Sequence, residues 1–181
     1  MKASTYLLKA ASGYFRELEG FVPGVTVSLP QEILNSKILS TLVLWSESLI
    51  SKEGSRRLDD IQIDFDSWFV DDVYGLFSAA TYLDFDRRFT SDLFGLCLQK
   101  CTMDRTLEML TLCQRLQEDC SQDSLVNNFM NSVCKVACQI FYKDHEDRAW
   151  QEMEEALINK HPHILKNILT HADYERMTIH T

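Results

Sequence analysis

The chain has 181 residues, of which 45% are hydrophobic, which is enough for a folded core, and its six glycines and three prolines favour helices over an all-strand fold. Its formal net charge of -9 at pH 7 argues against a nucleic-acid partner, because phosphate binding relies on clustered Lys and Arg side chains. No segment approaches the roughly 20 apolar residues that span a bilayer, and no signal peptide is recognised, so we expect a cytoplasmic or nuclear protein without a membrane partner.

Two short helices are predicted at the start of the chain. Ser4 or Thr5 is placed to cap a helix over Tyr6–Ala11. Ser12 is placed to cap a second helix, which Gly20 ends. A tight helical pair is therefore expected.

A short strand is predicted next. Val25–Leu29 alternates β-branched or apolar residues with Thr and Ser, and it is bounded by Pro23–Gly24 and Pro30. Ile61–Asp64 also alternates, and is either a second short strand or an extended arm. The expected fold class is therefore α+β, mostly α-helical, with a small reduced sheet.

Apolar residues recur at helical spacing through the rest of the chain. Ser36 is a plausible cap for one helix, and Asp71 or Asp72 for another, which Phe85 ends. The remaining helices are predicted at 90–99, 102–116, 125–142, 147–159 and 163–171. The polar patch Gln117–Ser124 is a candidate domain boundary.

No catalytic motif is recognised in the sequence. It has no glycine-rich phosphate loop, no Gly-x-Ser-x-Gly elbow and no His-Glu-x-x-His helix. His161 and His163 flank a proline without a third metal ligand, so a solvated turn is favoured there. We therefore expect a protein that is not an enzyme and needs no cofactor.

All six cysteines lie between residues 97 and 138, in segments with helical patterns, so reduced thiols are expected. Cys97 with Cys101, and Cys134 with Cys138, have i, i+4 spacing, and two facing helices would bring four thiolates to a zinc ion. Structural zinc sites usually have Cys-x-x-Cys on a knuckle, and free Cys is commonly buried, so core positions are favoured. A thiol or zinc enzyme stays a third alternative.

The strongest family resemblance lies in the first half of the chain. Three segments resemble the Skp-type adaptors of cullin ubiquitin ligases: Leu58-Asp59-Asp60-Ile61, Trp68-Phe69-Val70-Asp71 and the run Leu76–Phe85. That family has Asp-Asp-Ile, then an aromatic residue with Asp, and then Leu-Phe followed by Ala-Ala-Asn-Tyr-Leu-Asp-Ile. Leu7–Leu18 is similar to the helix pair of BTB/POZ domains, which share that fold. The resemblance implies a BTB/POZ-like domain over residues 1–100 and a BACK-like helical extension over 101–181.

The resemblance also implies a partner interface. In Skp-type adaptors the Asn-Tyr pair faces the cullin, and Thr81-Tyr82 stands at the matching positions here. Trp68 and Phe69 are adjacent in an extended segment, so one of them is expected in the core and the other on the surface. With Phe85 at the helix end, the predicted interface is Trp68, Phe69, Thr81, Tyr82 and Phe85.

This sequence departs from the family pattern in several places. It begins at the helix pair, where BTB domains open with two strands, and Leu49–Lys52 replaces the usual Tyr-Thr-Gly. The expected function is a non-catalytic adaptor or scaffold, with a cullin or BTB-type partner, that serves as a substrate adaptor of a cullin-RING ubiquitin ligase. The alternative is a structural subunit for homo- or heterodimerisation in a complex unrelated to ubiquitin.

Overall fold

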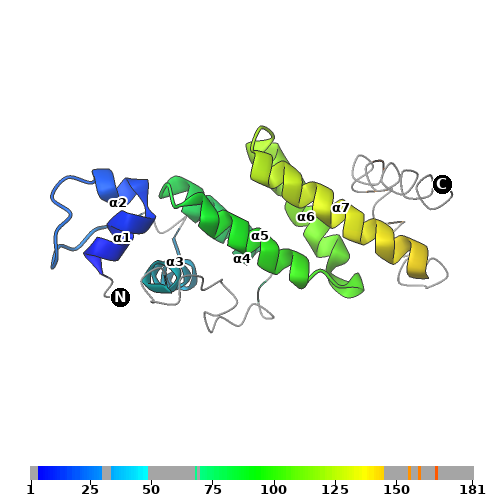
Figure 1. The fold of residues 1–181 in the computed structure, drawn as a ribbon, viewed down its shortest axis with the longest axis horizontal. Coiled ribbons are helices and arrows are strands. Elements are labelled where there is room, and N and C mark those ends of the chain that lie inside the picture. Colours follow the sequence, from blue (N-terminus) through cyan, green and yellow to red (C-terminus); the bar gives the residue numbers. More distant parts are fainter. Residues whose placement is uncertain are drawn as a thin grey trace. The chain divides into compact units, whose positions relative to one another are not determined.

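The computed structural model describes residues 4–29, 34–48, 68, 70–144, 155, 159 and 166, and this part of the chain is mostly helical, as predicted (Figure 1). The chain divides into two compact units, Met1–Leu96 (unit 1) and Cys97–Thr181 (unit 2). Its described helices are α1 (Thr5–Ala11), α2 (Gly13–Glu17), α3 (Ser36–Ser48), α4 (Val70–Tyr82), α5 (Arg87–Gln99), α6 (Met103–Cys120) and α7 (Ser124–Asp144).

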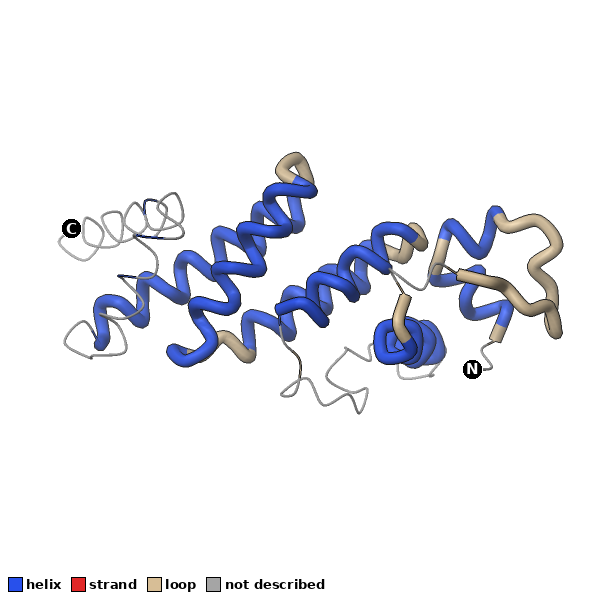
Figure 2. Tube along the Cα trace, turned by 180° about the vertical axis from the view of Figure 1, so that it is seen from behind, coloured by secondary structure: helices blue, strands red, loops and turns tan. Residues whose placement is uncertain are grey.

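The described residues contain no strand, so the predicted small sheet is not supported (Figure 2). Val25–Leu29 has no regular secondary structure, because a short strand needs a partner to form a ladder. The one isolated bridge among these residues joins Ser12 to Phe85 in antiparallel fashion. Ile61–Asp64 lies outside the described residues.

The predicted caps of α2 and α3 have different outcomes. Ser12 caps α2, because its Oγ accepts a hydrogen bond from the Phe15 N–H at 3.3 Å, as predicted. The cap of α3 is Asn35 instead of Ser36, since the Asn35 side chain accepts from the Ile38 N–H at 2.8 Å. Asparagine and serine are both good N-cap residues, so residue type alone could not decide which of these two neighbours caps α3.

Helix α4 begins at Val70, which places Asp71 and Asp72 in its first turn, where their charges favour the helix dipole. It ends at Tyr82 and not at Phe85. Asp84 adopts a left-handed φ of 48°, and the Phe85 N–H donates to the Ala80 carbonyl at 2.8 Å. This is a Schellman ending, with an aspartate where glycine is most common.

The later helices are longer than the apolar pattern predicted. Helix α5 begins at Arg87, because the Asp86 side chain accepts from the Arg88 N–H at 2.9 Å. Helix α6 continues to Cys120, and α7 follows after a short turn. The polar patch Gln117–Ser124 therefore covers the last turn of α6, the connection and the first residue of α7, all inside unit 2, and the two units divide at Leu96 and Cys97 instead. The helices predicted at 147–159 and 163–171 fall largely outside the described residues.

Aromatic rings form the core of unit 1. The ring centroid of Trp45 on α3 lies 5.2 Å from that of Phe89 and 6.2 Å from that of Phe85. The Trp45 Nε1–H donates to the Asp92 carboxylate at 3.3 Å, so its polar end is also satisfied. Burial of each such ring stabilises the fold by about 1.5–3 kcal/mol. This core holds α3 against the α4–α5 pair.

Helices α6 and α7 lie side by side and form the core of unit 2 (Figure 1). Their short connection makes them an antiparallel pair. The buried apolar residues include Leu110, Leu112, Leu116, Val126, Phe129, Val133 and Ala137. Among the described residues, no helix combines the length and apolarity that crossing a membrane requires.

Candidate functional site

The end of α4 is fastened to the α1–α2 pair by main-chain hydrogen bonds. The Gly13 N–H donates to the Asp84 carbonyl at 2.8 Å, and the Asp86 N–H donates to the Ala11 carbonyl at 2.8 Å. A Cβ atom on residue 13 would lie 1.8 Å from the Asp84 Oδ2, so any other residue there would force the Asp84 side chain to move. The close contact therefore depends on both the left-handed backbone of Asp84 and the missing side chain of Gly13.

Ser12 adds side-chain bonds at the same junction. Its buried hydroxyl donates to the Leu83 carbonyl and also accepts from the Phe15 N–H. The Tyr14 N–H donates to the same Leu83 carbonyl at 3.3 Å. One serine thus caps α2 and binds the end of α4, which fixes the two segments relative to each other.

This junction supports an exposed aromatic residue. Tyr82 is 44% exposed although it is a large hydrophobic side chain, and its ring centroid lies 5.8 Å from that of the half-buried Tyr14. Thr81 and Asp84 beside it are also exposed. We call Tyr14, Thr81, Tyr82 and Asp84 the Tyr82 surface. It presents an aromatic ring, a hydroxyl and a carboxylate on fixed backbone.

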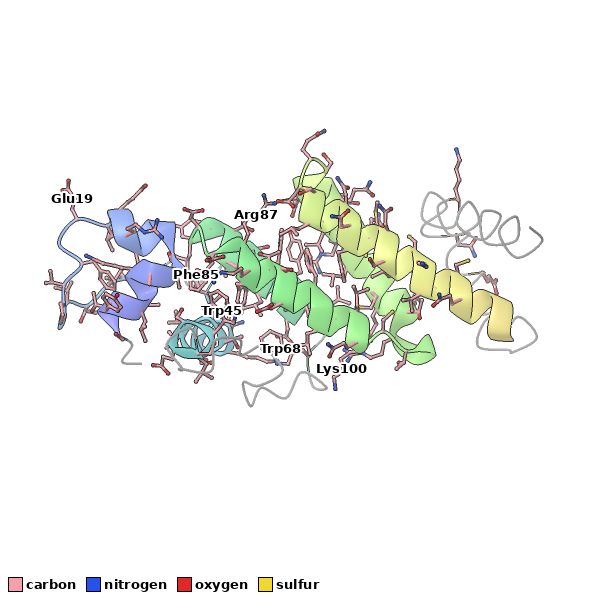
Figure 3. All side chains as sticks on the ribbon, viewed as in Figure 1. Glu19, Trp45, Trp68, Phe85, Arg87 and Lys100 are labelled. Carbon is pink, nitrogen blue, oxygen red and sulfur yellow. The ribbon has the colours of Figure 1, made fainter. Side chains whose placement is uncertain are left out.

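The four predicted interface residues that the structure describes do not lie together on the surface. Thr81 and Tyr82 are exposed. Trp68 and Phe85, which are labelled in Figure 3, are only 2% and 7% exposed. Phe69 lies outside the described residues. Trp68 and Phe85 therefore have almost no side-chain surface to offer a partner.

Trp68 and Phe85 have different neighbours. The Lys37 Nζ lies 4.3 Å from the centroid of the Trp68 ring, which is a cation–π contact. The same Lys37 Nζ forms an ion pair with Asp72 at 3.0 Å. Phe85 packs into the aromatic core, with its centroid 5.8 Å from that of Phe89. Both residues therefore belong to the packed interior of unit 1.

Tyr14 and Asp84 are members of the site that were not predicted from the sequence. Tyr14 lies on α2 and Tyr82 at the end of α4, so no local periodicity links them. The position of Asp84 beside Gly13 could not be predicted from the sequence, because it depends on the left-handed φ of Asp84. A small Gly13 directly before an aromatic residue was the only local signal of a close approach.

One ion pair lies next to this surface. The Arg88 side chain contacts the Asp86 carboxylate at 2.6 Å, and its hydrogen bond lowers the pKa of Asp86 below the ordinary value of 3.8. The Asp86 carboxylate therefore stays ionised at neutral pH. Because Asp86 also caps α5, its charge favours the start of that helix.

Three of the four cysteines considered above as zinc ligands, Cys97, Cys134 and Cys138, are buried, and Cys101 is partly exposed. Burial raises the pKa of Cys97 to about 12 and that of Cys134 to about 11, and it also raises that of Cys113. A thiol with so high a pKa is a poor nucleophile. Within the described part of the chain, no three His, Cys, Asp or Glu side chains are placed to hold a metal ion. His161 and His163 lie outside the described residues.

The chain was compared with known proteins at the level of families, sequences and folds. No protein-family model, no curated protein and no solved structure matches it.

Proposed function

We propose that this chain is a non-catalytic adaptor or scaffold that binds another protein through the Tyr82 surface. The observation that carries the proposal is the position of Tyr82, which is half exposed yet supported by the Tyr14 ring and by the hydrogen-bonded junction beneath it. Aromatic residues on rigid backbone bind with little loss of conformational entropy, and tyrosine is enriched among residues that dominate interface energies.

The leading version is a substrate adaptor of a cullin-RING ubiquitin ligase in the cytoplasm or nucleus. It rests on the resemblance to Skp-type adaptors, in which the residues matching Thr81 and Tyr82 face the cullin. In this version residues 1–100 form a BTB/POZ-like domain, and residues 101–181 a BACK-like extension. The exposure of both residues is compatible with that role.

The alternative is an assembly subunit of a complex unrelated to ubiquitin. One feature favours it, because Thr81 stands where Skp-type adaptors have an amide. Threonine has a single hydroxyl, whereas asparagine offers two N–H donors and a carbonyl acceptor. A partner that hydrogen-bonds to the Thr81 hydroxyl would then differ from a cullin.

Co-purification with a panel of cullins separates the two versions. The cullin version predicts that wild type binds at least one cullin, that Tyr82→Ala loses it and that Thr81→Asn binds more tightly. Tyr6→Ala is the matched control, since Tyr6 is a 77% exposed tyrosine on α1, outside the Tyr82 surface. No retention of any cullin above background would reject the cullin version.

A further inference from the structure

Residues Val25–Leu29, here called the open segment, form part of the loop after α2, and their Cα trace runs nearly straight (Figure 2). Within the described part of the chain, the Val25 N–H donates to the Val22 carbonyl at 3.2 Å, and no hydrogen bond is recorded for the residues from Thr26 to Leu29. The segment nevertheless has the alternating sequence of a strand. Its N–H and C=O groups are therefore available to a partner.

From Thr26 to Leu29 the side chains of the open segment alternate in burial. Thr26 and Ser28 are exposed, whereas Val27 and Leu29 are half-buried. Val25 does not follow this alternation, because it is 48% exposed, and Val22 before it is 52% exposed. The alternation is that of a strand with one face towards the protein, although no partner strand is present among the described residues.

The open segment also lacks the charges that normally protect an exposed strand edge. No residue from Phe21 to Leu29 is charged, although the whole chain has a formal net charge of -9. Natural proteins blunt such edges with charged side chains or with prolines inside the strand. Here the prolines, Pro23 and Pro30, lie outside the segment.

We propose that the open segment pairs in antiparallel fashion with the same segment of a second copy of this chain, centred on Val27. Only an extended chain supplies donors and acceptors at the spacing that a free strand edge presents. The sequence is complementary to itself, because this register sets Val25 opposite Leu29, Thr26 opposite Ser28 and Val27 opposite Val27. The neutral contact avoids like-charge repulsion between two acidic chains.

The pairing is expected to be weak and reversible. A five-residue strand pair buries less than the roughly 1,200 Å² of a stable protein interface. This self-association uses a segment separate from the Tyr82 surface and does not depend on the function proposed for that surface.

Sedimentation measurements from low micromolar concentration to about 1 mM test the pairing at the strengths expected. The wild type should shift reversibly towards a dimer. Thr26→Pro and Val27→Pro remove N–H donors that point to opposite edges of the strand, so at least one should abolish the shift. Neither N–H donates an intramolecular hydrogen bond, so both proline variants should keep the circular dichroism spectrum and the melting temperature of the wild type. Val27→Thr, which keeps the donor and the branching, is the control and should still dimerise.

Disulfide cross-linking tests the register. In the proposed pairing, Val27→Cys places two thiols opposite each other at a distance that a disulfide spans. Ser28→Cys faces Thr26 of the second copy and should cross-link no more than wild type. A wild type that stays monomeric throughout, a dimer that survives both proline variants, or equal cross-linking through residues 27 and 28 would overturn the proposal.

Discussion

The Gly13 N–H donates to the Asp84 carbonyl at 2.8 Å, while the Asp84 side chain fills the space that a Cβ on residue 13 would need. The two residues are far apart in sequence, and their contact joins the α1–α2 pair to the end of α4. The same contact determines where the neighbouring Tyr82 is held. The stability of this junction is therefore the first testable consequence of the structure.

Gly13→Ala should destabilise unit 1 by about 2 kcal/mol, because the new methyl group clashes with the Asp84 carboxylate. Asp84→Gly should be neutral or slightly stabilising, since glycine is preferred at the left-handed φ of a Schellman ending. The double variant should recover most of the loss. Chemical denaturation gives all the free energies.

Gly95→Ala is the matched control for this cycle. Gly95 lies in α5, and a Cβ there would meet nothing within 4 Å, so the change should stabilise by about 0.5–1 kcal/mol. If Asp84→Gly left the cost of Gly13→Ala unchanged, the clash between these two residues would not be its cause.

Ser12→Ala should cost about 1–2 kcal/mol, because it removes the cap of α2 and the bond to the Leu83 carbonyl together. Ser4→Ala is the comparison. Ser4 occupies the N-cap position of α1 but makes no side-chain capping bond, so its removal should change the free energy of unfolding by less than about 0.5 kcal/mol. Equal effects of the two substitutions in urea titrations would contradict the role given to Ser12.

Stability should depend on pH partly through Asp86. Its folded pKa lies below the unfolded value of 3.8, so its contribution is present above that value and is lost as the pH falls through the folded pKa. Asp86→Asn keeps an acceptor for the Arg88 N–H without the charge. The difference in unfolding free energy between wild type and Asp86→Asn should therefore shrink as the pH is lowered to about 3. A difference that stays constant with pH would count against the ion pair.

The buried thiols should be slow to react in the folded protein. Cys97, Cys113, Cys134 and Cys138 are buried, whereas Cys101 and Cys120 are partly exposed. Burial raises the pKa of Cys97 in the folded protein from the ordinary 9.0 to about 12, so the contribution of this thiol to stability is present below pH 9 and is lost as the pH rises towards 12. Mass spectrometry after brief alkylation at neutral pH should find label on the two partly exposed residues first.

Cys113 provides the comparison in that experiment, since it lies in α6 like Cys120 but is buried. Its labelling should appear only when denaturant is added. Labelling of Cys113 at the rate of Cys120 in the native protein would show that the α6–α7 core is not packed as described.

Local patterns predicted much of the helical structure. The cap at Ser12 was predicted from residue type alone, and the apolar spacing located α3, α4 and α7 to within a few residues. The predictions were wrong where the local structure depends on a contact between residues far apart in sequence. The end of α4 depends on the left-handed Asp84, and the strand predicted at Val25–Leu29 has no partner among the described residues.

The candidate site was predicted only in part. Thr81 and Tyr82 were named from the sequence and are exposed, but nothing local indicated that Tyr14 would lie beside them. Trp68 and Phe69 were both included in the predicted interface, with one of the two expected in the core, and Phe85 was included with them. The same rings also fill cores. Trp68 lies against Lys37 and Phe85 packs against Trp45, and both of these neighbours are distant in sequence.

The most direct test of the central claim is a quantitative pull-down from native extract with wild type, Tyr82→Ala and Tyr6→Ala. Each variant is first checked for an unchanged melting temperature. The account predicts that Tyr82→Ala loses at least one partner by about tenfold or more, as removal of an interface anchor does, and that Tyr6→Ala retains it. An identical set of partners for wild type and Tyr82→Ala would contradict the Tyr82 surface as the binding site.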